Sequence, residues 1–128
     1  MSPSCRKLLV TFLGLASLSV FALAKRVAPR PVPPVISDGI RYSVEGDGRN
    51  QFVVAADVST AGHELWRVKV FHNHIKFWQE EDVQWVFITD LKLVGNSLVM
   101  RDERLRCYSI DLMTKQVKKQ QCSGFFQQ

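Results

Sequence analysis

The sequence predicts a mainly β fold, made of two antiparallel meanders that one short helix or loop insertion joins. Three observations support this class. Apolar and polar side chains alternate over several short segments, which is the period of a half-buried strand. These segments are rich in aromatic and β-branched residues. Small clusters of Gly, Asn, Asp, Ser and Thr separate them, as in sequential hairpins whose strands pair with their neighbours.

The second meander has the clearer pattern. The first of its strands is rich in aromatic and β-branched residues, and Gly95-Asn96 then suits a two-residue hairpin turn. Asp102-Glu103-Arg104 is a charged turn, and Met113-Thr114-Lys115 is the next turn. The expected strands are residues 85–94, 97–101, 106–112 and 116–119.

The first meander is expected to have three strands, at residues 40–45, 51–58 and 64–71. Between the meanders the alternation stops, and a short helix or ordered loop fits best there. Phe77 and Trp78 in this insertion are expected to pack on the sheet, while the acidic residues 80–82 face solvent. With the two meanders the prediction is five to seven strands.

The first 24 residues are typical of a secretory signal peptide. Arg6 and Lys7 precede an apolar run at residues 8–24, which ends in the small-x-small pattern Ala22-Leu23-Ala24. The expected location is therefore periplasmic or secreted. The alternative is an uncleaved membrane anchor at residues 8–24, because the run is long enough for a tilted span and Lys25 and Arg26 follow it directly.

The rest of the chain divides by composition. Four prolines between residues 25 and 38 predict an extended linker, residues 39–119 form the β domain, and residues 120–128 form a C-terminal tail. The net charge of the whole chain is +5. Between residues 35 and 117, however, there are 10 basic and 12 acidic residues. This balance argues against nucleic-acid binding, which needs a basic face on the fold itself.

Export also bears on the cysteines. Cys5 belongs to the signal peptide, and Cys107 and Cys122 remain as an even pair in an oxidising compartment. A disulfide between them would tie the tail to a strand. The alternative is a buried free Cys107, because spacing in sequence does not give distance in space.

Two segments of the chain resemble each other, at residues 55–60 and 109–114. Each has an apolar strand, an Asp and a Thr three residues later, which is a strand-ending turn in which Asp accepts backbone N–H bonds. The residues Ala55, Asp57, Thr60, Gly62, Leu65 and Trp66 resemble the blade signature of pyrroloquinoline-quinone-type β-propellers.

That resemblance implies two blade-like units and a Trp66 packed between blades. The match is partial, because Ala61 is an extra residue and Lys115 stands where the second copy should have Gly. Two units are also fewer than the roughly four to eight blades of a propeller. The resemblance therefore implies a blade-like domain without the quinone-dependent activity of the larger relatives.

The candidate site residues are few. His72 and His74 project from one face of an extended segment, a spacing that can hold a metal, and an acidic residue at positions 80–82 could complete such a site. A lone His-x-His is more often an exposed strand end. Phe77 and Trp78 are the candidates for a binding surface, although large aromatics usually form the core of so small a domain. No catalytic motif and no cofactor site are expected.

The sequence thus predicts an exported, non-catalytic interaction module of the cell envelope, whose partner is another envelope protein. Two alternatives remain open. One is a small metal-binding protein or metal-dependent enzyme that uses His72 and His74. The other is a subunit that completes a larger propeller.

Overall fold

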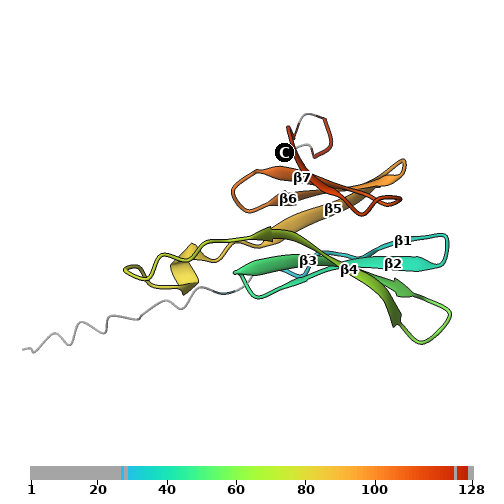
Figure 1. Ribbon diagram of the computed structural model, residues 1–128, viewed down its shortest axis with the longest axis horizontal. Helices are drawn as coiled ribbons and strands as arrows, with labels where there is room; N and C mark the ends of the chain where they lie inside the picture. The colour runs from blue at the N-terminus through green and yellow to red at the C-terminus, as the bar shows by residue number, and fades with distance from the viewer. Residues whose placement is uncertain (1–26, 28, 123, 127–128) are drawn as a thin grey trace, which may run out of the picture.

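In the computed structural model, which describes residues 27, 29–122 and 124–126, the chain forms two four-stranded antiparallel sheets. Strand order follows the sequence in each sheet (Figure 1). The predicted mainly β class and its two meanders are confirmed. The strands are β1 (Val35–Ser37), β2 (Ile40–Gly46), β3 (Asn50–Asp57), β4 (His63–His72), β5 (Ile88–Val94), β6 (Ser97–Asp102), β7 (Cys107–Asp111) and β8 (Val117–Gln120).

The predicted insertion between the meanders is a loop with one 3₁₀ turn, η1 (Asp82–Gln84). Among the described residues there is no helix of the length and apolar character that crossing a membrane requires. The expected signal peptide, residues 1–24, lies outside the described part of the chain.

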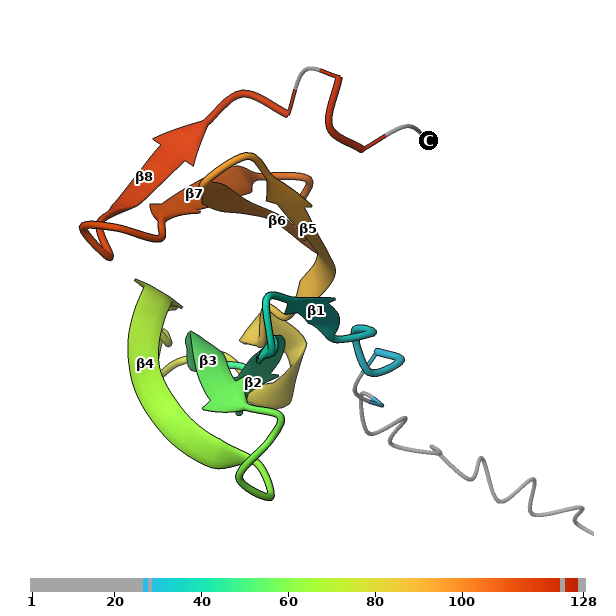
Figure 2. The same ribbon diagram turned by 90° about the vertical axis from the view of Figure 1, so that its right-hand side faces the viewer.

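The two sheets pack face to face, with β1 and β5 side by side at one edge (Figure 2). The apolar side of each sheet covers that of the other, as the period-2 alternation requires. Burial of each large side chain stabilises the fold by about 1.5–3 kcal/mol. The buried cluster consists of Tyr42, Val53, Ala55, Val70, Ile88, Leu98, Met100, Tyr108 and Ile110.

Aromatic and polar contacts join the sheets at specific points. The ring of Phe71 on β4 stacks on Tyr108 of β7, with 5.2 Å between centroids. The ammonium of Lys115, in the β7–β8 turn, lies 4.9 Å from the ring centroid of Trp66. Trp66 therefore lies on the inner side of its sheet, next to the β7–β8 turn of the other sheet.

The pairing of β4 with β3 is irregular at two points, next to Phe52 and next to Ala56. Simple alternation would place Phe71 on the same face as Arg67 and Lys69. Near Phe52, β4 has one residue more than β3, so the side chains beyond this point lie on the opposite face from the one that alternation predicts. Phe71 therefore packs on the inner face.

The two similar turns have the bonding expected of them. The Asp57 carboxylate accepts the Ser59 N–H at 2.9 Å, and that of Asp111 accepts the Met113 N–H at 2.8 Å. Lys115 adopts a φ of 61°, in the left-handed region that glycine favours. The Asp-x-x-Thr pattern is thus a device that ends a strand.

The predicted linker at residues 25–38 is wrong at its end, because β1 belongs to the sheet. Val35 pairs with Tyr42 across a turn at Asp38 and Gly39, which have φ values of 51° and 73°. Asp-Gly is a strong hairpin signal, because a tight hairpin requires positive φ at both central positions. With β1, and a full β8, the described part of the chain has eight strands rather than five to seven.

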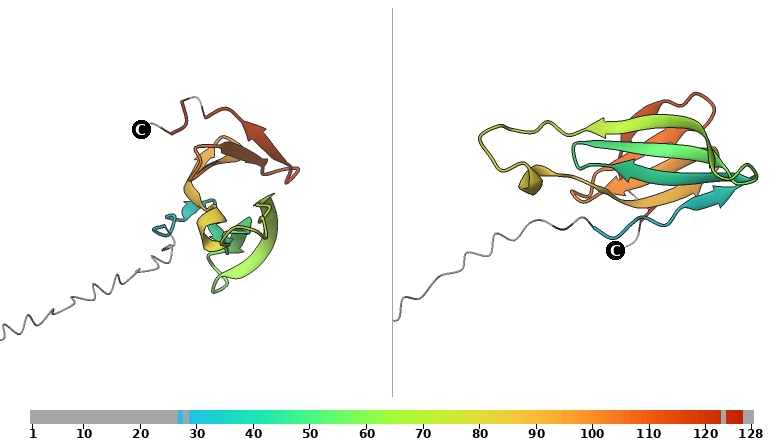
Figure 3. Two further views of the ribbon diagram at one scale, coloured as in Figure 1. Left: turned by 90° about the vertical axis from the view of Figure 1, so that its left-hand side faces the viewer. Right: turned by 90° about the horizontal axis from the view of Figure 1, so that it is seen from below.

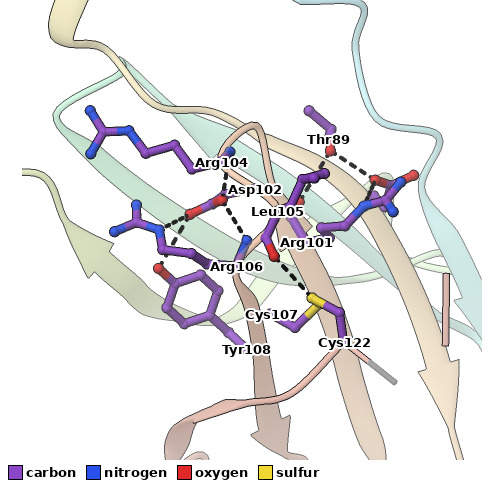
Figure 4. Close-up of a disulfide and its surroundings, with 10 residues drawn as sticks. Thr89, Arg101, Asp102, Arg104, Leu105, Arg106, Cys107, Tyr108 and Cys122 are labelled. Carbon is purple, nitrogen blue, oxygen red and sulfur yellow. Dashed lines mark hydrogen bonds and ion pairs between the residues drawn. A yellow bond between two sulfur atoms is a disulfide. The ribbon is translucent and has the colours of Figure 1, made fainter. Parts of the chain in front are cut away.

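The β6–β7 turn is organised by a buried carboxylate, Asp102, which has no exposed surface (Figure 4). It accepts hydrogen bonds from the backbone N–H groups of Arg104 and Arg106, from the Arg106 guanidinium and from the Tyr108 hydroxyl. Burial raises the pKa of Tyr108, and the nearby charge of Asp102 raises it further. All of this carboxylate's bonds are local, so it fixes the turn beside the start of β5.

Cys107 and Cys122 form a disulfide, with 5.2 Å between their Cα atoms (Figure 4). Cys107 pairs with Arg101 and Gln120, and so lies on the side of its sheet that faces away from the other sheet. From Cys122 the chain turns back over that outer side, where the Arg101 guanidinium lies 5.3 Å from the ring centroid of Phe126. The tail therefore covers part of the outer face of β5–β8.

Loss of this disulfide is expected to destabilise the protein. The bond closes a span of 15 residues, for which the loss of chain entropy on unfolding predicts roughly 3 kcal/mol. Cys122→Ser should therefore lower Tm by roughly 10–20 °C in a thermal melt. A reducing agent should lower the Tm of the wild type to that of the variant and leave the variant unchanged. An equal Tm for oxidised wild type and variant would contradict a docked tail.

Candidate functional site

The loop at residues 73–87 connects β4 to β5 and extends beyond the ends of both sheets (Figure 3). We call it the connecting loop. It takes the chain from one sheet to the other, and its backbone groups therefore have no strand partners of their own. What satisfies those groups decides whether the loop has one conformation.

One buried side chain, Gln84, bonds several backbone groups in the outer part of the loop. Its Oε1 accepts the Lys76 N–H at 2.7 Å, and its Nε2 donates to the carbonyls of Lys76, Gln79 and Glu80 at 2.9, 3.2 and 3.1 Å. Gln84 is only 8% exposed. It therefore serves residues 76–80 much as a neighbouring strand would, and holds them in one conformation.

The loop also rests on the β2–β3 turn. A Cβ atom at Gly48 would lie 2.4 Å from Cγ of Trp85, so only glycine allows this close approach, and its φ of 88° also favours glycine. The Val86 N–H donates to the Gly48 carbonyl at 3.1 Å. Beside it, Arg49 donates to Glu81, and this bond lowers the pKa of the Glu81 carboxyl. The ion pair is therefore complete at neutral pH.

The far end of the loop carries two exposed aromatic side chains. Phe77 is 92% exposed and Trp78 is 66% exposed. The two rings contact each other edge to face, with 5.1 Å between centroids, and the Lys76 ammonium lies 5.9 Å from the Trp78 centroid. We call Phe77 and Trp78 the aromatic tip. The expectation that they pack on the sheet is wrong, because Gln84 holds the segment outside it.

The structure does not bring the two candidate metal ligands together with a third. The Nδ1 atom of His72 lies 2.7 Å from the Asn50 Oδ1, in a hydrogen bond across the strands. His74 lies further along the connecting loop. Across the described ranges, no group of three or more His, Cys, Asp and Glu side chains is placed to hold a metal.

Other apolar side chains are exposed at both ends of the sheets. Val83 of the connecting loop and Leu105 of the β6–β7 turn lie at the same end as the tip, and others lie at the opposite end in the β3–β4 and β7–β8 turns. They are aliphatic, and they include Val58 at 49% and Met113 at 79% exposure. Single exposed aliphatic residues are common on protein surfaces. Two exposed aromatic rings in contact on an internally bonded loop are less common. They make the connecting loop the candidate binding surface.

Comparison of the sequence with protein-family models and with curated proteins finds no match. The resemblance to propeller blades therefore rests on the motif residues of the sequence alone.

Gln84 and Gly48 have structural roles that sequence reasoning missed. A single Gln between acidic and apolar residues carries no signal in sequence. Gly48 is part of a recognised turn cluster, but its contact with Trp85 joins segments 37 residues apart. Phe77 and Trp78 are visible in the sequence as aromatic residues next to charged ones, although their exposure is not.

Replacement of Gln84 by Met, a side chain of similar length, is expected to release the connecting loop. Without Oε1 and Nε2, the Lys76 N–H and the carbonyls of Gln79 and Glu80 lose these partners, at about 1–3 kcal/mol for each group left buried. Hydrogen exchange at the Lys76 amide should accelerate at least about tenfold. Amides of β6 and β7 should keep their protection. Gln79→Met, at an exposed position in the same loop, should change neither. Unchanged protection of Lys76 in Gln84→Met would contradict this role.

Proposed function

We propose that the protein is an exported, non-catalytic binding module of the cell envelope, and that it contacts its target through the aromatic tip. The observation that carries this proposal is the exposure of Phe77 and Trp78 on a loop that is internally bonded. The exposure of aromatic rings to water is unfavourable, so their burial against a target is favourable. Rings that are already held in one conformation also lose little conformational entropy on binding. The signal-like N-terminus supports the location.

The chemistry of the described residues supports a binding role over a catalytic one. Both cysteines of the described part are in the disulfide, and so neither is a free nucleophile. Glu81, an acidic residue of the connecting loop, is engaged by Arg49 of the β2–β3 turn. His72 is bonded to Asn50. These groups hold the structure together, and none faces a second group suited to proton transfer.

The polar outer face of the β5–β8 sheet argues against the alternative of a propeller subunit. In a propeller, each blade face packs on the next blade and is apolar. The pairing register places mostly polar side chains on the outer face of β5–β8, and the tail covers part of it. These outer residues are Asp90, Lys92, Val94, Ser97, Val99, Arg101, Cys107, Ser109, Asp111, Lys118 and Gln120.

The proposal is tested with immobilised protein and detergent-solubilised envelope extract. Wild type should retain an envelope component, and Phe77→Ser/Trp78→Ser should retain at least about tenfold less, because central aromatic residues commonly carry 2 kcal/mol or more of binding energy. Met113→Ser removes an equally exposed apolar side chain at the other end and should bind as the wild type does.

Both variants change exposed side chains, so their thermal melts should match that of the wild type within a few degrees. That match separates loss of binding from loss of folding. Equal retention by the wild type and by the double variant would refute the proposal, as would a wild type that retains nothing from the extract and also fails to bind lipid vesicles.

A further inference from the structure

We infer that the aromatic tip meets the interface of a lipid bilayer. This inference rests on the proposed function and names its target. It differs from the sequence-based expectation of another envelope protein, and the experiment below distinguishes the two.

The first support is where the chain enters the domain. Residues 29–32 line a hollow of about 180 Å³ together with Gly46 and Phe87. Gly46 ends β2 and Phe87 ends the connecting loop, so the N-terminal segment enters at the end of the sheets from which that loop projects (Figure 1). The aromatic tip and the chain entry thus share one pole of the molecule.

The sequence upstream makes this shared pole significant. The apolar run at residues 8–24 ends five residues before Pro29. An extended chain spans at most about 3.6 Å per residue, so this connection reaches about 18 Å. A membrane that holds the apolar run would therefore lie within about 18 Å of Pro29, at the end of the sheets that carries the aromatic tip. Lys25, Arg26 and Arg30 follow the run, as basic residues do beside lipid headgroups.

The second support is the chemistry of the tip. Tryptophan and other amphipathic aromatic residues concentrate at membrane–water interfaces, where one part of the ring system is dry and another is wet. The Lys76 ammonium near the Trp78 ring is placed to stay in the headgroup layer while its stem lies along apolar surface. The tip projects outward, and a bilayer accepts a projecting group without a preformed pocket.

The charges around the tip indicate the kind of lipid surface. Lys76 and Glu80 are both exposed and lie on either side of the aromatic pair in sequence. Neither sign dominates, so zwitterionic headgroups fit this surface as well as anionic ones do. Two side chains are a small anchor. Binding through the tip alone should therefore be weak and reversible, with insertion limited to the outer 5–10 Å or so of the bilayer.

The test uses the exported protein as the producing cell processes it, with phosphatidylcholine vesicles that contain or lack brominated acyl chains. Trp78 emission should shift to shorter wavelength and be quenched by the brominated lipid. Trp78→Phe keeps an aromatic side chain there, and the difference between it and wild type isolates Trp78 from the half-buried Trp66 and Trp85. Quenching in that difference signal supports the inference whether or not the apolar run is retained.

Affinity is the second readout. If the processed protein lacks the apolar run, Phe77→Ser/Trp78→Ser should lower the vesicle-bound fraction about tenfold, and Met113→Ser should leave it unchanged. Replacing a third of the lipid by phosphatidylglycerol should strengthen the binding of wild type and Phe77→Ser/Trp78→Ser alike through Lys25, Arg26 and Arg30, and should change the ratio between the two proteins less than about threefold.

An unquenched, unshifted Trp78 signal would overturn the inference. If the envelope extract still showed a component lost in Phe77→Ser/Trp78→Ser, the target would be a protein and the proposed function would stand. If the extract also showed none, both would fail.

Discussion

The structure depends on the burial of two sheet faces against each other. Each sheet has one apolar side, and in the described part of the chain only the other sheet covers that side. The contacts that define the pairing are specific: Phe71 stacks on Tyr108, and the Gln51 side chain accepts the backbone N–H of Ile88 at 3.1 Å. Because the sheets follow each other in sequence, one segment must cross between them. The connecting loop is that segment.

The crossing explains why a polar side chain is buried where the sequence shows no reason for one. A loop that leaves one sheet and enters another passes through a region without strand partners, and Gln84 replaces them with four hydrogen bonds. The same bonds prevent Phe77 and Trp78 from folding back onto the sheets. Rigidity of the loop and exposure of its aromatic rings thus have one cause.

Much of the architecture could be predicted because it follows from local pattern. The alternation in β5, β6 and β7 correctly places Leu98, Met100 and Ile110 on the inner face. The Asp-led turns were also readable. What failed depends on contacts between distant segments. The prolines that precede β1 led to its assignment to the linker, although an Asp-Gly turn follows it. The irregular pairing of β4 with β3 places Phe71 on the face opposite to the one that alternation predicts. The exposure of Phe77 and Trp78 follows from Gln84, which has no periodic signature.

The edge strands of the two sheets, β1, β4, β5 and β8, differ in sequence, but each has a feature that hinders pairing with a further strand. β4, the longest, is interrupted twice in its pairing, and β5 once. β8 carries Lys118 and Lys119, while β1 has three residues and follows two prolines. Irregular pairing, adjacent lysine charges and prolines without an amide donor all hinder the addition of a foreign strand. We therefore expect these edges to hinder fibrillar aggregation at high local concentration, although nearly all regular structure of the described residues is extended.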